Sequence, residues 1–150
     1  MDGGPHLSAA VFCETVIEAK DNTISLIRII DTVTQTATGP EPPAQMPAFL
    51  INTKLVISLK ADQARGRYSI KIRPEAPDGR QLVTHEQAVQ LDGGERGVNL
   101  IVEMTFPAEL EGVYWFDVLF VASPEDERLL TRVPLRIVYQ PQTVPQSSSS

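Results

Sequence analysis

The sequence predicts an all-β protein, an antiparallel two-sheet β-sandwich of the immunoglobulin-like type with about seven to eight strands. Apolar and polar residues alternate along most of the chain with a period of two, which is typical of half-buried strands. Turn signals recur at intervals that suit a sandwich. No segment carries the sustained 3.6-residue stripe of a helix. The 150 residues, 42% of them hydrophobic, are sufficient for one core and one domain.

Two strands are predicted near the N-terminus, from about Ala9 to Glu18 and from about Thr23 to Val33. Asp21-Asn22 lies between them and is typical of a tight turn, because both residues tolerate the left-handed region. The second strand is apolar on both faces near its end, which favours a central strand or a bulge. Five further alternating runs predict strands that begin near Phe49, Arg67, Val98, Tyr114 and Leu129.

The connecting segments follow from glycine, proline and serine. Asp78-Gly79 and Asp92-Gly93-Gly94 are each predicted to be hairpin turns. Residues 34–47 contain four prolines and are predicted to form a long exposed crossover. Residues 82–91 alternate as a strand does, although a short helical turn near Glu86 is an alternative. Residues 1–8 are predicted to be a flexible N-terminus, 9–139 the domain, and 140–150 a disordered serine-rich tail.

The most specific local pattern is Leu110-Glu111-Gly112-Val113-Tyr114-Trp115-Phe116. Immunoglobulin-like sandwiches often turn a corner with a tyrosine whose hydroxyl bonds to the backbone upstream, and antibody domains place a cysteine two residues later. Tyr114 is the candidate tyrosine, and Phe116 stands at the cysteine position. The alternative is an ordinary strand that follows a glycine turn.

Two parts of the chain carry a family resemblance. The first runs from Phe12-Cys13-Glu14 to Asp31 and is followed by the proline-rich segment. The second is Gly112 to Val118 together with Val133-Pro134-Leu135. Together they resemble a family of small, uncharacterised bacterial all-β domains of unknown function. The resemblance implies an all-β fold over most of the chain, and it implies no activity and no functional residues.

The residues that usually carry catalysis are few. The chain has two histidines, His6 and His85, and one cysteine, Cys13, and it contains no Gly-x-Ser-x-Gly elbow. Gly93-Gly94 lacks the Lys-Ser/Thr ending of a phosphate loop. The acidic residues of the loops lack the repeated spacing of a calcium loop. We therefore predict a protein that is not an enzyme and that holds no metal or other cofactor.

Charge and cysteine content bear on compartment and partners. The net charge of -6 argues against non-specific binding of nucleic acid. A single cysteine excludes an internal disulfide and favours a reducing compartment. The first residues lack the basic and apolar regions of a signal peptide, and no apolar run is long enough to span a bilayer. We therefore predict a cytoplasmic protein that does not contact a membrane, of undetermined oligomeric state.

Two surfaces are candidates for binding. Arg67, Lys71 and Arg73 share one side of a predicted strand and form a cationic ribbon, unless acidic residues on neighbouring strands offset its charge. On the strand of Tyr114, the opposite side carries an apolar set that is expected to face solvent if Tyr114 faces the core, unless the proline-rich segment or residues 82–91 cover it. Its members are Trp115, Leu119 and Val121. Pro134 lacks a backbone donor and predicts an edge or a bulge in the last strand.

These features favour one function over two others. The first hypothesis is a non-enzymatic, cytoplasmic interaction or accessory module that binds another protein through a sheet face or edge. The alternative is a β-sandwich that binds a small ligand or a carbohydrate through a concave face and Trp115. An enzyme of unrecognised type is the least favoured.

Overall fold

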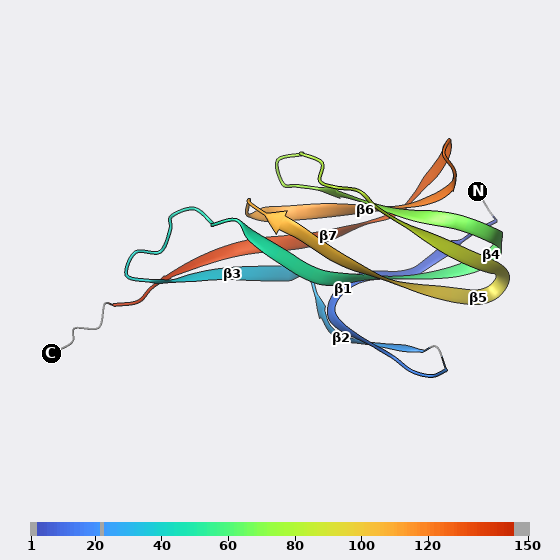
Figure 1. Ribbon diagram of the computed structural model, residues 1–150, viewed down its shortest axis with the longest axis horizontal. Coiled ribbons are helices and arrows are strands. Elements are labelled where there is room, and N and C mark those ends of the chain that lie inside the picture. The colour runs from blue at the N-terminus through green and yellow to red at the C-terminus, as the bar shows by residue number, and fades with distance from the viewer. Residues whose placement is uncertain (1–2, 22, 146–150) are drawn as a thin grey trace.

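The computed structural model describes residues 3–21 and 23–145, and every regular element in them is a β-strand (Figure 1). The seven strands are β1 (His6–Glu18), β2 (Ile24–Ile30), β3 (Thr32–Gly39), β4 (Phe49–Glu75), β5 (His85–Ala108), β6 (Gly112–Ser123) and β7 (Asp126–Thr143). The prediction of an all-β fold with about seven strands is therefore confirmed. Residues 85–91 belong to β5, so this segment is a strand and not a helical turn.

All seven strands are hydrogen-bonded into one sheet, in the order β2-β1-β4-β6-β7-β3, with β5 paired to β4. Only β3 and β7 are parallel neighbours. The strands β4 and β5 are so long that they run through two halves of a curled sheet (Figure 1). A sandwich of two separate sheets is therefore not confirmed.

The first half of the sheet contains β2, β1, residues 49–60 of β4 and residues 97–108 of β5. The second half contains residues 85–92 of β5 and 66–75 of β4, followed by β6, β7 and β3. The core lies between these halves. The Phe12 ring on β1 meets the Phe116 ring on β6 edge-on, with the ring centroids 4.8 Å apart.

The bend between the halves replaces the hairpin predicted at Asp92-Gly93-Gly94, which is wrong. The register of β4 and β5 shifts between Lys60 and Arg65, opposite these glycines. Asp62, Gly93 and Gly94 have φ angles of 53°, 82° and 70°. Residues with positive φ angles occur in β-bulges as well as in turns. The chain therefore bends at this level and continues in the same direction.

The predicted second strand, Thr23 to Val33, divides at Asp31 into β2 and β3. The strand β2 pairs with β1 in the first half of the sheet, whereas β3 pairs with β7 in the second. The alternative of a central strand for this segment is wrong, because β2 is an edge strand. An irregularity does occur in β2, where Arg28 has a φ of 64°.

The exposed crossover predicted for residues 34–47 is wrong for residues 34–39, which belong to β3. The four prolines all follow Gly39, so none of them interrupts residues 34–39. These residues can form an edge strand, which needs hydrogen bonds on one side only. The remaining loop folds back on the body, because the Tyr139 hydroxyl donates a hydrogen bond to the Pro43 carbonyl.

The terminal segments predicted to be flexible are also too long, because the strands extend into both of them. Residues 6–8 belong to β1, and the Gly3 carbonyl accepts a hydrogen bond from the Gln63 amide, so the first described residues are held against β4. At the other end, residues 140–143 belong to β7 and pair with β3. The remainder of the predicted flexible ends, residues 1–2 and 146–150, lies outside the described residues. Asn22 of the predicted Asp21-Asn22 turn lies outside them as well.

The tyrosine corner is confirmed. The buried Tyr114 hydroxyl donates a hydrogen bond of 2.9 Å to the Leu110 carbonyl and accepts one of 3.3 Å from the Leu110 amide. Gly112 lies between them with a φ of 128°, and a Cβ there would come within 2.9 Å of Pro77. The glycine is therefore required both by its backbone conformation and by the close approach of the loop after β4.

Candidate functional site

Trp115 faces outward from β6, as the sequence predicts, and is 37% exposed. It lies between Glu75 on β4 and Pro134 on β7. The Arg132 guanidinium stacks on the indole at 4.9 Å from the ring centroid, which is a cation–π contact. One face of the indole is therefore already occupied by the protein's own arginine.

Leu119 and Val121 beside Trp115 are only 7% and 8% exposed, so the alternative that this face is covered holds for these two residues. An ion pair reaches across this face of β6. Lys71 on β4 and Glu127 on β7 approach to 2.6 Å, although β6 lies between their strands. Their side chains therefore cross over β6 and cover the aliphatic side chains of Leu119 and Val121.

The same contacts offset the predicted cationic ribbon. Glu127 accepts hydrogen bonds from both Lys71 and Arg73, the second at 3.2 Å. Arg132 likewise pairs with Asp117 at 2.7 Å. Of the ribbon, Arg67 alone forms no ion pair with another residue in the part of the chain that the structure describes. The alternative of a solvated face balanced by cross-strand partners therefore holds for Lys71 and Arg73.

These ion pairs make the free energy of unfolding depend on pH in the acidic range. The Lys71 and Arg73 hydrogen bonds lower the pKa of the Glu127 carboxyl in the folded state. A lowered folded-state pKa contributes stability above the unfolded-state pKa, and that contribution is lost as pH falls through the folded-state value. We expect the free energy of unfolding of Glu127→Gln to fall less than that of the native protein across this acidic range.

Chemical unfolding at a series of pH values would measure this difference. Glu125→Gln is the matched control, because Glu125 is exposed and forms no ion pair with any described residue. Its pH dependence should equal that of the native protein. If Glu127→Gln also follows the native curve, the ion pairs of Glu127 do not contribute to the pH dependence of the free energy of unfolding.

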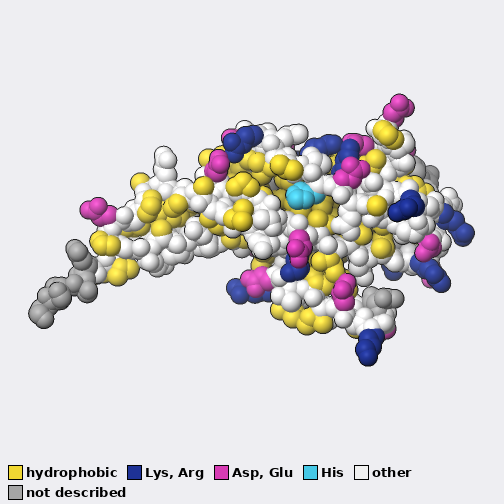
Figure 2. Space-filling model, viewed as in Figure 1, with side chains coloured by type: hydrophobic (Ala, Val, Ile, Leu, Met, Phe, Trp, Pro, Cys, Tyr) yellow, Lys and Arg dark blue, Asp and Glu magenta, His cyan; other side chains and the backbone are white. Residues whose placement is uncertain are grey.

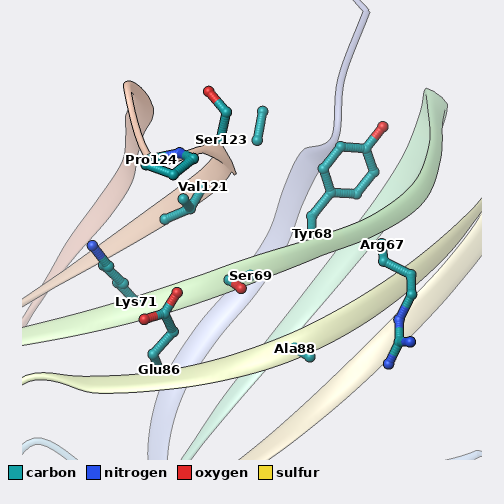
Figure 3. A pocket seen from close by; sticks show the side chains of 10 residues that line it. Arg67, Tyr68, Ser69, Lys71, Glu86, Ala88, Val121, Ser123 and Pro124 are labelled. Carbon is teal, nitrogen blue, oxygen red and sulfur yellow. The ribbon is translucent and has the colours of Figure 1, made fainter.

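A hollow of about 530 Å³ lies at the other end of this face, between β4, β5 and the turn after β6 (Figure 3). Its lining includes Arg67, Ser69, Ser123 and the ion-paired Lys71. This Lys71 pairs with Leu119, four residues along β6 from Trp115, a distance of about 13 Å at the rise of a strand. Trp115 and this hollow therefore do not form one site.

The histidines and the cysteine lie apart. The Nε2 atom of His6 is 2.8 Å from Asp62 near the bend of β4, whereas His85 begins β5 opposite Ile72. In the described ranges, no cluster of three or more His, Cys, Asp or Glu side chains is arranged to hold a metal ion. Those ranges also contain no helix that is long and apolar enough to span a membrane.

Cys13 on β1 is fully buried as a free thiol. Burial raises the pKa of this thiol, partly offset by the charge of Lys54. A thiol with a raised pKa stays protonated, and the protonated form is a poor nucleophile. We expect a disulfide reagent to label Cys13 in the native protein at least ~100-fold more slowly than in the unfolded chain. Similar rates in the two states would contradict the burial of this residue.

The surface that the sequence analysis missed is the outward face of the β1–β2 hairpin. Ile17, Ile27 and Ile29 are 52%, 46% and 61% exposed there. Ile27 and Ile29 alternate along β2, and Ile17 pairs with Ser25, one step diagonally from Ile27. These three residues are called the isoleucine stripe below. In Figure 2 the hairpin projects below the body of the molecule, and hydrophobic atoms gather on its lower side.

One signal for this stripe is visible in the sequence. The second predicted strand is apolar on both faces, which in a half-buried edge strand leaves one apolar face uncovered. Val16 and Leu26, on the other face of the hairpin, are half-buried. That face therefore packs on the protein, and the isoleucine stripe is the face left over.

The described strands, the tyrosine corner and the curled sheet define an all-β protein. Residues 8–138 match the model of a family of unknown function, DUF6941, and the chain belongs to that family. The resemblance to a family of uncharacterised domains is thereby confirmed. No curated protein matches the chain in sequence.

Two solved structures are similar to this chain. The C-terminal domain of wzt superimposes with a TM-score of 0.50 and 13% identity, over 99% of this chain and 85% of that chain. An immunoglobulin-like protein from Pseudomonas aeruginosa gives a TM-score of 0.40 and 15% identity, over 89% of this chain and 96% of that chain. At such low identity the first neighbour supports the fold alone.

Proposed function

We propose that this chain is a non-enzymatic, cytoplasmic accessory module that binds another protein through a sheet face. The observation that carries the proposal is the isoleucine stripe of Ile17, Ile27 and Ile29 on the β1–β2 hairpin. Isolated exposed aliphatic residues are common on protein surfaces, but a contiguous set on one projecting element marks a contact surface. We also propose that the topology is of the immunoglobulin-like class, which the tyrosine corner supports.

The energetics suit a docking surface of moderate affinity. Complete burial of an isoleucine side chain contributes about 1.5–3 kcal/mol. Each residue of the stripe is already about half-buried. Covering the remaining halves of three side chains would therefore contribute about 2–4 kcal/mol to binding. The remaining free energy of binding must come from contacts around the stripe, where Thr15 and Ser25 are exposed on the same face.

The alternative of a small-ligand or carbohydrate site has weaker support. It requires Trp115 to share a concave face with a cavity, and the lining residue Lys71 lies about 13 Å along the sheet from the level of Trp115. Arg132 also covers one face of the indole. A sugar that stacks on Trp115 would have to displace this guanidinium or use the other face alone.

Site-specific photo-crosslinking tests the proposal. A photoreactive amino acid at Ser25, beside the stripe, should give discrete adducts with a partner protein in cells that express the protein naturally. The double variant Ile27→Ser/Ile29→Ser, carrying the same probe, should lower their yield about tenfold or more, because about 1.4 kcal/mol of lost binding is a factor of ten.

The matched control is Leu50→Ser/Val83→Ser, since these two residues are 66% and 79% exposed but lie outside the hairpin. This variant should retain the native adducts. Equal adduct yields from the stripe variant and the control would overturn the proposed surface.

A further inference from the structure

The strands β2, β3 and β5 lie at the ends of the pairing order of the sheet, so each has one hydrogen-bonding edge along its length that no other described strand covers. Proteins usually protect such edges with charges, prolines or bulges, because an unprotected edge pairs with another chain. The edge of β2 is interrupted at Arg28, whose φ is 64°. The edge of β5 carries the bulge at Gly93-Gly94, several charged residues and Pro107.

The third edge, that of β3, has none of these protections. Its sequence is Thr-Val-Thr-Gln-Thr-Ala-Thr-Gly, without a charged residue or a proline. Its eight residues pair with β7 in one unbroken register. Thr32, Thr34, Thr36 and Thr38 are all exposed.

The direction of the main chain shows which groups are free. The Asp31 carbonyl accepts a hydrogen bond from the Arg136 amide of β7, and the Gly39 carbonyl accepts one from the Val144 amide just after β7, each at 2.9 Å. Successive residues of a strand direct their main-chain groups to opposite sides, so the odd-numbered residues of β3 face β7. The N–H and C=O groups of the four threonines therefore point away from β7, toward an incoming strand.

The order of residues in β3 indicates which strand is complementary to this edge. From Thr32 to Thr38 the sequence reads the same in both directions, except that Val33 exchanges with Ala37. Gln35 is the centre of this near-palindrome. A strand of this kind is complementary to itself when two copies run antiparallel about a two-fold axis, which is the condition for an isologous interface.

We infer that β3 pairs with β3 of a second copy of this chain, antiparallel, about a two-fold axis at Gln35. Thr34 then lies opposite Thr36 of the partner subunit, and Thr32 opposite Thr38 of the partner subunit. All four threonines of each copy occupy hydrogen-bonded pairs, because their main-chain groups point outward. Threonine pairs across strands are favourable, and no charge is placed opposite a like charge.

The shape of the molecule allows this pairing. The strands β3 and β7 extend away from the body as an arm, with β3 on its outer side (Figure 1). Antiparallel pairing at Gln35 overlaps the two arms and places the two bodies at opposite ends. An interface of one eight-residue strand is far smaller than the ~1,600 Å² of a standard stable complex. The dimer is therefore a concentration-dependent one.

Charge substitutions at the edge test the inference by sedimentation velocity over a range of protein concentrations. The native chain should show a sedimentation coefficient that rises with concentration. Thr34→Lys and Thr36→Glu should each remain monomeric, because each brings two like charges close together across the two-fold axis. An equimolar mixture of the two variants should associate again, because the lysine of one then faces the glutamate of the other.

Thr84→Lys is the control for added charge, since Thr84 is exposed in the loop before β5 and should leave self-association unchanged. Amide hydrogen exchange gives a second readout. The amides of the four threonines should exchange more slowly as the native concentration rises. A native chain that stays monomeric, or single variants that associate as the native chain does, would overturn the inference. This outcome is independent of the crosslinking at the isoleucine stripe.

Discussion

Phe116→Ala is expected to lower the free energy of unfolding by about 3–5 kcal/mol. The side chain is fully buried and touches both halves of the sheet. Its ring lies 4.8 Å from that of Phe12 on β1 and 5.5 Å from that of Phe106 on β5. Removing it leaves a cavity that the rings of Phe12 and Phe106, held on two other strands, cannot relax to fill.

The position of Phe116 explains the size of this effect. Antibody domains join their two sheets with a disulfide at the position two residues after the corner tyrosine. Here the aromatic cluster around Phe116 joins the two halves of the sheet instead. Because a domain is stable by only about 5–15 kcal/mol, this one truncation removes a large share of the total.

Urea unfolding monitored by Trp115 fluorescence, together with circular dichroism, would measure the change. Leu50→Ala is the control, because Leu50 is an exposed residue of β4 and its truncation should cost no more than about 0.5 kcal/mol. A loss below 1 kcal/mol for Phe116→Ala would contradict the packing described above.

Tyr114→Phe is expected to cost about 1–2 kcal/mol, although it removes a single oxygen atom. The Tyr114 hydroxyl satisfies both the amide and the carbonyl of Leu110, and phenylalanine leaves both without that partner. The ring itself stays in place, so no large cavity contributes. The loss therefore measures the corner hydrogen bonds alone.

Tyr68→Phe is the comparison, because the Tyr68 hydroxyl makes one hydrogen bond, to the Arg65 carbonyl, at an exposed position. Water can replace this bond, so the variant should cost less than Tyr114→Phe. Thermal or urea unfolding of the two variants side by side would test this order. A cost for Tyr114→Phe equal to or below that for Tyr68→Phe would mean that the corner does not stabilise the fold.

The sequence predicted the fold class because alternation depends on local chemistry. A strand with one face in the core must place apolar residues at every second position, so the runs that begin at Phe49, Val98 and Tyr114 were recognisable without any partner strand. The corner was recognisable for the same reason, since Tyr114 and Leu110 are four residues apart and meet through a local turn.

The continuity of strands was not recognisable in this way. Asp92-Gly93-Gly94 supplies positive φ angles, which suit a hairpin and a bulge equally. Only the matching irregularity at Asp62 on the paired strand makes this site a bend between two halves of one sheet. The predicted strands from Phe49 and Arg67 are consequently one strand, β4.

The sequence predicted that Trp115 points outward but left open whether another segment covers this face, and the structure leaves Trp115 37% exposed and buries Leu119 and Val121. Parity along β6 places all three on one face, but burial depends on what neighbouring strands lay over that face. The ion pair between Lys71 and Glu127 joins residues 56 positions apart in sequence. Neither the period of β6 nor its composition contains that information.

The sequence by itself determined that this chain folds as strands, where the corner lies and which residues pack in the core, because these properties follow from the identity and spacing of neighbouring residues. The tertiary structure decided which faces and edges remain open. It covered Leu119 and Val121, left the isoleucine stripe uncovered, and placed β3 at an unprotected edge. These outcomes depend on contacts between strands distant in sequence, and such contacts arise only when the sheet curls and closes its core.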